Sequence, residues 1–147
     1  MPRLSYALLC TDVIVDKDSN AVSYIRVAEV IHFARLPGRV PPLVVALAFE
    51  RAPGDDAGFG LRLSLVAPDG KVSPMVGFSV PAAPGPNQRL SLRLAGMAVE
   101  GVGRHAVLVE RAEGGGHVPL AELPLHVVLR EGPRPQGGLQ EPEGPVQ

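Results

Sequence analysis

Apolar and polar residues alternate along much of the chain between Leu4 and Leu129, and this alternation limits the folds that the chain can adopt. The run 61–65 alternates leucine with Arg62 and Ser64, and the runs 90–94 and 123–129 repeat the pattern. Because successive side chains of a β-strand point to opposite faces, such alternation predicts half-buried strands. We expect strands at residues 4–16, 21–33, 41–51, 59–67, 72–80, 88–99, 104–112 and 118–130.

Turn residues separate these runs, and helical periodicity is nearly absent. The segments "KDSNA", "APGDDAG" and "APDGK" contain the Gly, Pro, Asn and Asp that tight turns prefer. Short strands joined by hairpin-like turns predict an all-β chain that forms a single antiparallel β-sandwich of seven to nine strands, with a barrel as the second choice. The topology would be immunoglobulin- or fibronectin-like without a disulfide, because the chain has no tryptophan and only one cysteine.

Length and charge exclude several classes of protein. A chain of 147 residues is long enough for one domain with a core, and 46% hydrophobic residues indicate a globular fold. The 14 basic and 15 acidic residues are spread along the chain, so we expect no nucleic-acid partner. The apolar stretch before Cys10 is too short for an export signal, and no stretch is long enough to span a membrane, so we expect no membrane partner. A single cysteine favours a reducing, cytoplasmic location.

Asp16, Asp18 and Asn20 stand at alternate positions, as the first ligands of a calcium loop do. An EF-hand loop that began at Asp16 would need glycine at Ala21 and glutamate at Val27. The same residue types close tight turns, because they bond their own backbone and tolerate left-handed geometry. We therefore predict a hairpin corner at residues 16–20, with calcium binding as the alternative.

No other group of residues indicates catalysis, a metal or a cofactor. Cys10 with Asp12 and a histidine could form a nucleophilic pair, but Cys10 lies in an apolar strand, where a free cysteine usually packs as a small hydrophobe. The acidic pair Asp55 and Asp56 lies in a glycine-rich turn. The histidines lack metal-binding spacing, and we expect them on the surface or the rim: His32, His105, His117 and His126. We therefore predict that the protein is not an enzyme, and we assign no catalytic, cofactor or metal residues.

The strand in "PPLVVALAFER" is apolar on both faces. One face carries Leu43, Val45, Leu47 and Phe49, which is typical of a core. The other face carries small apolar residues where polar ones are usual, and Val128 would extend that face if both strands share a sheet. Something should cover such a face, either a loop such as "RLPGRVPP" or a second copy of the chain. The possible interface is Val44, Ala46, Ala48 and Val128.

The composition changes after residue 131. The segment "GPRPQGGLQEPEGPVQ" is rich in Pro, Gly, Gln and Glu, with Leu139 and Val146 as its only large apolar residues. Such a segment cannot bury enough apolar surface to order itself. We predict a domain at residues 1–131 and a flexible tail at residues 132–147, with a proline-rich ligand for a partner as the alternative function of the tail.

The chain resembles a family of small bacterial domains of unknown function. The resemblance rests on the opening "YALLCTDVIVD", the strand "PPLVVALAFER", the Pro-Asp-Gly turn of "LRLSLVAPDGKV" and the closing "AELPLHVVLRE". It spans about residues 5–131, although Thr11 stands where the family has an acidic residue. The resemblance implies a single bacterial cytoplasmic sandwich and carries over no activity.

These patterns favour a non-catalytic protein-interaction or scaffold module that binds a protein partner or a second copy of itself. The alternative is a small-molecule or metal-binding domain, or an enzyme, with a pocket at one end of the sandwich. Carbohydrate binding is disfavoured because sugar platforms use aromatic faces and the chain has two Tyr, four Phe and no Trp.

Removal of the predicted tail provides a test of the domain boundary. Truncation after Glu131 should leave the melting temperature within about 2 °C, because substitutions and deletions outside the packed core rarely change stability much. Thermal unfolding of the full chain and the truncated chain measures this, and a larger loss would show that the tail packs on the domain.

Overall fold

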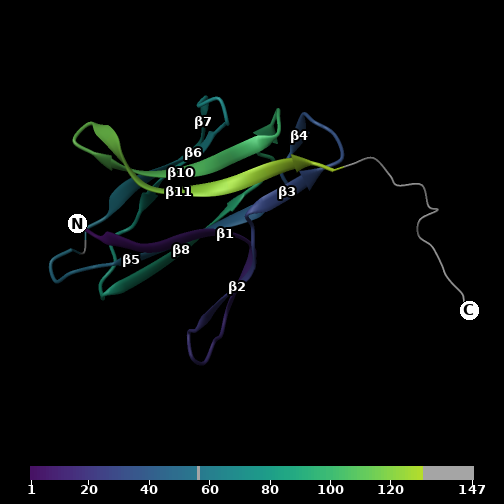
Figure 1. The fold of residues 1–147 in the computed structure, drawn as a ribbon. Helices are drawn as coiled ribbons and strands as arrows, with labels where there is room; N and C mark the ends of the chain where they lie inside the picture. The colour runs from purple at the N-terminus through teal and green to yellow at the C-terminus, as the bar shows by residue number, and fades with distance from the viewer. Residues whose placement is uncertain (56, 131–147) are drawn as a thin grey trace, which may run out of the picture.

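A computed structural model describes residues 1–55 and 57–130, and these residues form strands, turns and loops with no helix. The all-β prediction is therefore confirmed for this part of the chain (Figure 1). The predicted tail, residues 132–147, lies outside the described residues. The strands are β1 (Arg3–Val15), β2 (Val22–Val27), β3 (Val30–Phe33), β4 (Gly38–Arg39), β5 (Leu43–Glu50), β6 (Phe59–Val66), β7 (Val72–Val80), β8 (Asn87–Leu94), β9 (Ala98–Val99), β10 (Gly103–Glu113) and β11 (Gly116–Leu129).

Each predicted run contains a strand, but two runs are divided. The run 21–33 splits at Ala28 and Glu29 into β2 and β3, which belong to different sheets. Arg26 adopts a left-handed backbone with φ of 53° just before this break, and a non-glycine residue rarely does so inside a strand. The run 88–99 similarly divides into β8 and β9. Local alternation does not reveal these changes of direction.

Most of the strands form two main sheets (Figure 1). A four-stranded sheet has the order β2-β1-β5-β8, and a five-stranded sheet has the order β3-β11-β10-β6-β7. The short strands β4 and β9 pair with each other. The prediction of purely antiparallel pairing is wrong for β3, which runs parallel to β11. The chain continues from β2 in one sheet to β3 in the other through Ala28 and Glu29. On this path β3 enters the second sheet in the same direction as β11.

The inner faces of the two sheets share one core. The alternating leucines of β6 lie in this core, as do Leu123, Leu125 and Val127 of β11. Burial of each such side chain stabilises the fold by roughly 1.5–3 kcal/mol. On β8, however, Leu94 is buried whereas Leu90 and Leu92 are only half-buried, although all three face the core. The edge at β8 is therefore incompletely covered.

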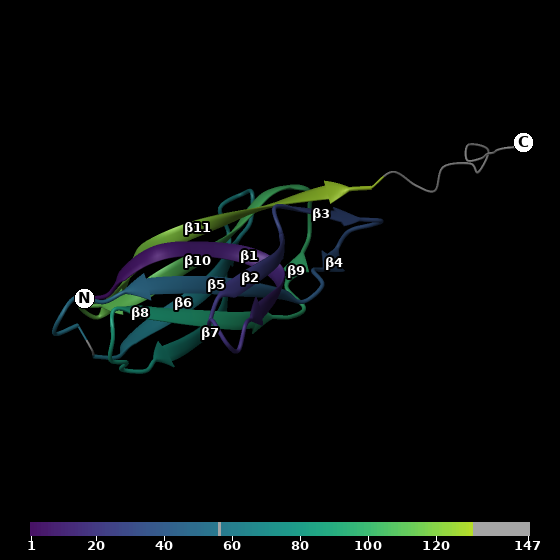
Figure 2. The same ribbon diagram turned by 90° about the horizontal axis from the view of Figure 1, so that it is seen from below.

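The hairpin of β1 and β2 projects from the outer side of the four-stranded sheet and overlies β5 when seen from below (Figures 1 and 2). Tyr6 on β1 and Arg89 on β8 flank Ala48 in one row across the sheet. The Tyr6 and Tyr24 hydroxyls are hydrogen-bonded, and Arg89 Nη2 donates to the Asn20 carbonyl at 2.9 Å. Tyr24 and Asn20 thus connect β2 and the hairpin turn to β1 and β8, the two neighbours of β5, and bridge its outer face.

The four residues of the predicted interface do not form one surface. Val44, Ala46 and Ala48 are buried within the single chain, and Ala46 is 0% exposed. Val128 is 40% exposed and lies in the other sheet, on β11. The loop "RLPGRVPP" is not the cover of β5, because its Val40 enters the core and its Gly38 and Arg39 pair with β9. The apolar outer face of β5 is covered instead by the chain's own hairpin.

Arginine substitutions at Ala46 and at Val128 should have different effects on stability, because the first position is buried and the second is exposed. Ala46→Arg should lower the free energy of unfolding by at least about 3 kcal/mol, because it buries an unpaired charge under the hairpin. Val128→Arg should change it by less than about 0.5 kcal/mol. Urea unfolding measures both. A stable, folded Ala46→Arg protein would show that the hairpin does not cover this face.

Candidate binding cleft

A cleft opens between the edge strands of the two sheets. β8 ends the four-stranded sheet and β7 ends the five-stranded sheet, so each has one unpaired edge among the described strands. Between them lies a cavity of about 740 Å³, bounded by the turn 67–71, by β7 and β8 and by residues 95–102. This volume falls within the range of about 300–1,000 Å³ that is usual for ligand pockets.

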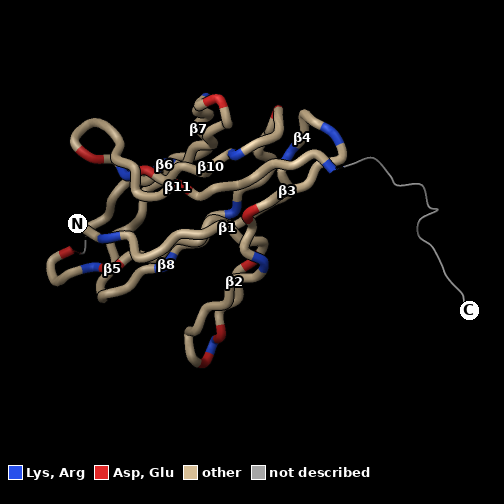
Figure 3. The backbone as a smooth tube through the Cα atoms, in the orientation of Figure 1, with Lys and Arg blue, Asp and Glu red and all other residues tan. Residues whose placement is uncertain are grey.

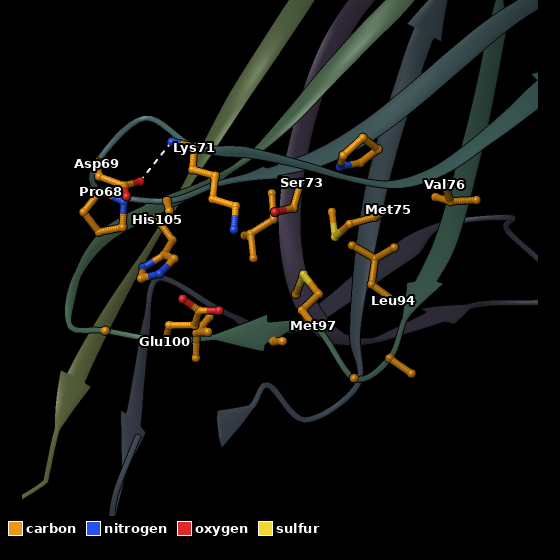
Figure 4. Close-up of a pocket in the computed structure, with 18 of the residues that line it drawn as sticks. Pro68, Asp69, Lys71, Ser73, Met75, Val76, Leu94, Met97, Glu100 and His105 are labelled. Atoms are coloured by element: carbon orange, nitrogen blue, oxygen red, sulfur yellow. Dashed lines mark hydrogen bonds between the residues drawn. The ribbon is translucent and has the colours of Figure 1, made fainter. Parts of the chain in front are cut away.

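One end of the cleft is apolar (Figure 4). Met75, Leu94 and Met97 lie at this end, and the last two side chains are largely buried. Val76 forms part of the wall and is 40% exposed. Methionine is flexible and polarisable, so it adapts to apolar groups of different shapes. This end of the cleft therefore suits an apolar side chain or hydrocarbon.

The other end of the cleft carries polar groups from three segments (Figure 4). Lys71 follows the turn, Glu100 follows β9 and His105 lies on β10. Among the described residues, neither Lys71 nor Glu100 has an oppositely charged group within 4.0 Å. The side chains of both are therefore available to a ligand. With Asp69 and Arg93, the charged lining consists of two acidic and two basic residues.

His105 is 2% exposed, with its Nδ1 atom 3.2 Å from the Gly103 carbonyl oxygen. Because a carbonyl can only accept, Nδ1 donates this hydrogen bond. Gly103 has φ of 124°, and a Cβ atom there would stand 3.0 Å from Pro68. Glycine is therefore needed where β10 packs on the turn that carries Lys71.

Local sequence explains the shape of the cleft. Gly70 adopts φ of 90°, and the Ala67 and Lys71 backbones close the turn with a 2.9 Å hydrogen bond. The ladder between β6 and β7 shifts between Leu63 and Ser64, which leaves Met75 as the extra residue of a bulge. A bulge redirects side chains and increases twist, and it places Met75 at the cleft.

Electrostatically the surface is mixed. Basic and acidic residues are interspersed along the described backbone, and no element carries a continuous run of one sign (Figure 3). The cleft repeats this balance, so its field does not strongly favour a net anionic or a net cationic ligand.

The predicted corner at residues 16–20 is confirmed as a hairpin turn between β1 and β2. Asp16 Oδ1 accepts the Asp18 backbone amide at 2.8 Å, and Asn20 has φ of 60°. The backbone amides of Asp18 and Ser19 lower the pKa of the Asp16 carboxyl. Within residues 1–55 and 57–130, no group of three or more His, Cys, Asp or Glu side chains could hold a metal ion.

Cys10 is fully buried on β1, and burial raises the pKa of its thiol. Asp55 is bonded to the Met1 ammonium group, which lowers the pKa of this carboxyl, whereas Asp56 lies outside the described residues.

The structure does not bring the histidines together. His32, His117 and His126 are exposed, as predicted, but the prediction of a surface or rim position is wrong for His105. His105 shares the core side of β10 with Val107 and Val109, and this alternation is visible in the sequence. Sequence analysis also missed Lys71, Met97 and Glu100, because no local pattern shows that their segments meet.

In comparisons with known proteins, no family model and no curated protein matches the chain. The resemblance to small bacterial domains therefore stays a prediction. Within the described residues, no helix has the length and apolar character needed to cross a membrane.

The Asp16 carboxylate predicts a pH-dependent difference in stability. Because its pKa is lower in the folded chain, its charge stabilises the fold above the unfolded pKa, and this contribution is lost as the pH falls through the folded pKa. The melting temperature of Asp16→Asn should therefore be lower than that of the parent at pH 7, by no more than about 3 °C because the lost hydrogen bond is exposed. At about pH 2 the two melting temperatures should be equal. Equal differences at both pH values would show that the charge has no part in the turn.

Proposed function

We propose that this chain is a non-catalytic β-sandwich module of the bacterial cytoplasm, fibronectin-like in topology, that binds a protein partner in the cleft between β7 and β8. The strand order β1-β5-β8 in one sheet and β11-β10-β6-β7 in the other supports the topology, because the chain changes sheet after β5, after β7 and again between β8 and β10. The free, buried Cys10 supports a reducing compartment.

The cleft carries the proposal. It joins a half-buried apolar wall to a small set of polar groups, and this combination marks a ligand site. A peptide backbone offers both N–H donors and C=O acceptors. Glu100 can accept from the donors, and Lys71 can donate to the acceptors. An extended chain segment therefore satisfies both ends of a cleft whose charges balance.

A small apolar molecule is the second candidate occupant, and the cavity volume favours it. About 740 Å³ can hold a molecule of drug size without any main-chain contact. The apolar end would hold its body, and a single hydroxyl or amide group would reach Lys71 or Glu100.

Arginine substitutions at two valines of similar exposure test the protein-binding function. Peptides selected from a random display library against the immobilised full chain should bind at least about tenfold more weakly to Val76→Arg, because the new charge enters the apolar end of the cleft. Val118→Arg, on β11 and outside the cleft, should change the affinity less than twofold; Val76 is 40% exposed and Val118 37%.

Isothermal titration calorimetry measures these affinities. Failure to select any peptide, or selected peptides that bind Val76→Arg unchanged, would overturn the proposal. An increase of the melting temperature with 1-octanol, lost in Val76→Arg, would in that case assign the cleft to a small apolar ligand.

A further inference from the structure

We infer that the partner segment binds as an added strand on the free edge of β8, with apolar residues facing the cleft and acidic residues facing outward. This inference rests on the proposed function, because it describes how an extended segment would occupy the same cleft. Addition of a strand to a sheet edge is an established mode of peptide recognition in which main-chain hydrogen bonds supply affinity and alternate side chains supply specificity.

The inner face of β8 lacks the neighbours that a further strand would provide. Leu90 and Leu92 face the core opposite Leu47 and Val45 of β5, and both β5 residues are fully buried. The two leucines of β8 are only half-buried, because the strand has a neighbour on one side alone. An added strand would place its inward side chains beside them, and at Leu92 these side chains would enter the cleft.

The free edge of β8 is better suited to pairing than the free edge of β7. β8 contains neither proline nor glycine and pairs with β5 in continuous register over Asn87–Leu94. β7 contains Pro74, which has no N–H group, next to the bulge at Met75. Proline and bulges both interrupt hydrogen bonding along an edge strand. The cleft therefore has one edge competent for pairing and one edge that resists it.

Charge on the outer face of β8 selects the partner. Arg89, Ser91 and Arg93 alternate with the inward leucines, and Arg93 also borders the cleft. The Arg93 side chain is 60% exposed and lies 4.0 Å from Asp12, and Arg89 donates to the Asn20 carbonyl without an acidic partner among the described residues. Side chains of a paired strand would lie about 5 Å away, where opposite charges attract and like charges repel. Acidic outward residues therefore fit this edge, whereas antiparallel pairing of β8 with a second copy would bring arginines together.

A synthetic peptide tests this inference on the full chain. The probe is an acetylated and amidated octapeptide in which glutamate alternates with valine or leucine, and its control has lysine in place of glutamate. The glutamate peptide should bind the parent at least about tenfold more tightly than the lysine peptide does. Arg93→Glu should abolish this preference, because it leaves one basic and one acidic side chain on the outer face of β8 without changing the core. A tenfold change corresponds to about 1.4 kcal/mol, which is within reach of two altered cross-strand contacts.

N-methylation identifies main-chain pairing. Because alternate amides of a strand point to opposite sides, methylation of one alternating set should weaken binding at least about tenfold and methylation of the other set should not. Calorimetry measures affinity, and circular dichroism and thermal unfolding confirm that Arg93→Glu is folded. Equal binding of the two peptides, no binding by either peptide, or equal tolerance of both methylation sets would overturn the added-strand inference.

The outcomes also separate this inference from the proposed function. If library-selected peptides depend on Val76 but the glutamate peptide does not bind, the cleft function stands and strand addition fails. If the glutamate peptide depends on Arg93 but no peptide depends on Val76, the β8 edge pairs with a strand without using the cleft, and the proposed function fails together with the placement of apolar side chains in the cleft.

Discussion

The central strand β5 is apolar on both faces, and most of the fold follows from the need to cover it. Residues 43–49 are all buried, with one face in the shared core and the other on the outside of the four-stranded sheet. An antiparallel sheet usually leaves one face to solvent, and that face is then polar. Here the β1–β2 hairpin leaves the line of its sheet and lies across β5, where Tyr24 contacts Tyr6 and Asn20 accepts from Arg89. The left-handed backbone at Arg26 comes where the chain leaves this hairpin for the other sheet.

Because the N-terminal segment contributes strands to both sheets, the two lateral edges of the structure differ. After the hairpin, the chain passes to β3 and extends the five-stranded sheet beyond β11, so that side gains a strand. The opposite side ends at β7 and β8, which are joined through residues 81–86. Arg51 holds this connection, because its guanidinium donates to the carbonyls of Ala57 and Pro81 and to the Gln88 side chain. The two edges are therefore tied together near Arg51, and the cleft lies farther along them, beside the turn that carries Asp69 and Lys71.

Sequence analysis could predict the parts of the fold that depend on neighbouring residues. Alternation located the strands and the core leucines of β6 and β11, and the preferences of Asp, Ser and Asn located the hairpin corner at residues 16–20. Small apolar residues at Val44, Ala46 and Ala48 correctly indicated a covered face, because an exposed face would carry polar groups. The identity of the cover could not be predicted, because it depends on Asn20 and Tyr24, which are distant in sequence from β5.

The cleft was beyond prediction for a related reason. Lys71, Met97 and Glu100 come from a turn, a loop and the end of a two-residue strand, and only the packing of the two sheets brings them together. The parallel pairing of β3 with β11 and the placement of Val128 in the five-stranded sheet likewise depend on which sheet a strand joins. Alternation determines which side chains of a strand share a face, but it does not determine which other strand pairs with it. His105 is the exception, because its alternation with Val107 and Val109 is visible in the sequence and would have corrected the prediction of a surface or rim position.

The arginines of β8 address the risk that its open edge creates. An edge strand with exposed leucines and free main-chain groups can pair with the same strand of another molecule, and charged side chains on the edge oppose such pairing. In an antiparallel pair of β8 strands centred on Ser91, each Arg89 would lie opposite the other copy's Arg93, and this repulsion disfavours self-association. The same charges attract a strand with acidic residues at those positions. Protection from aggregation and selection of a partner therefore do not conflict at this edge, because both follow from the sign of two exposed side chains above a row of half-buried leucines.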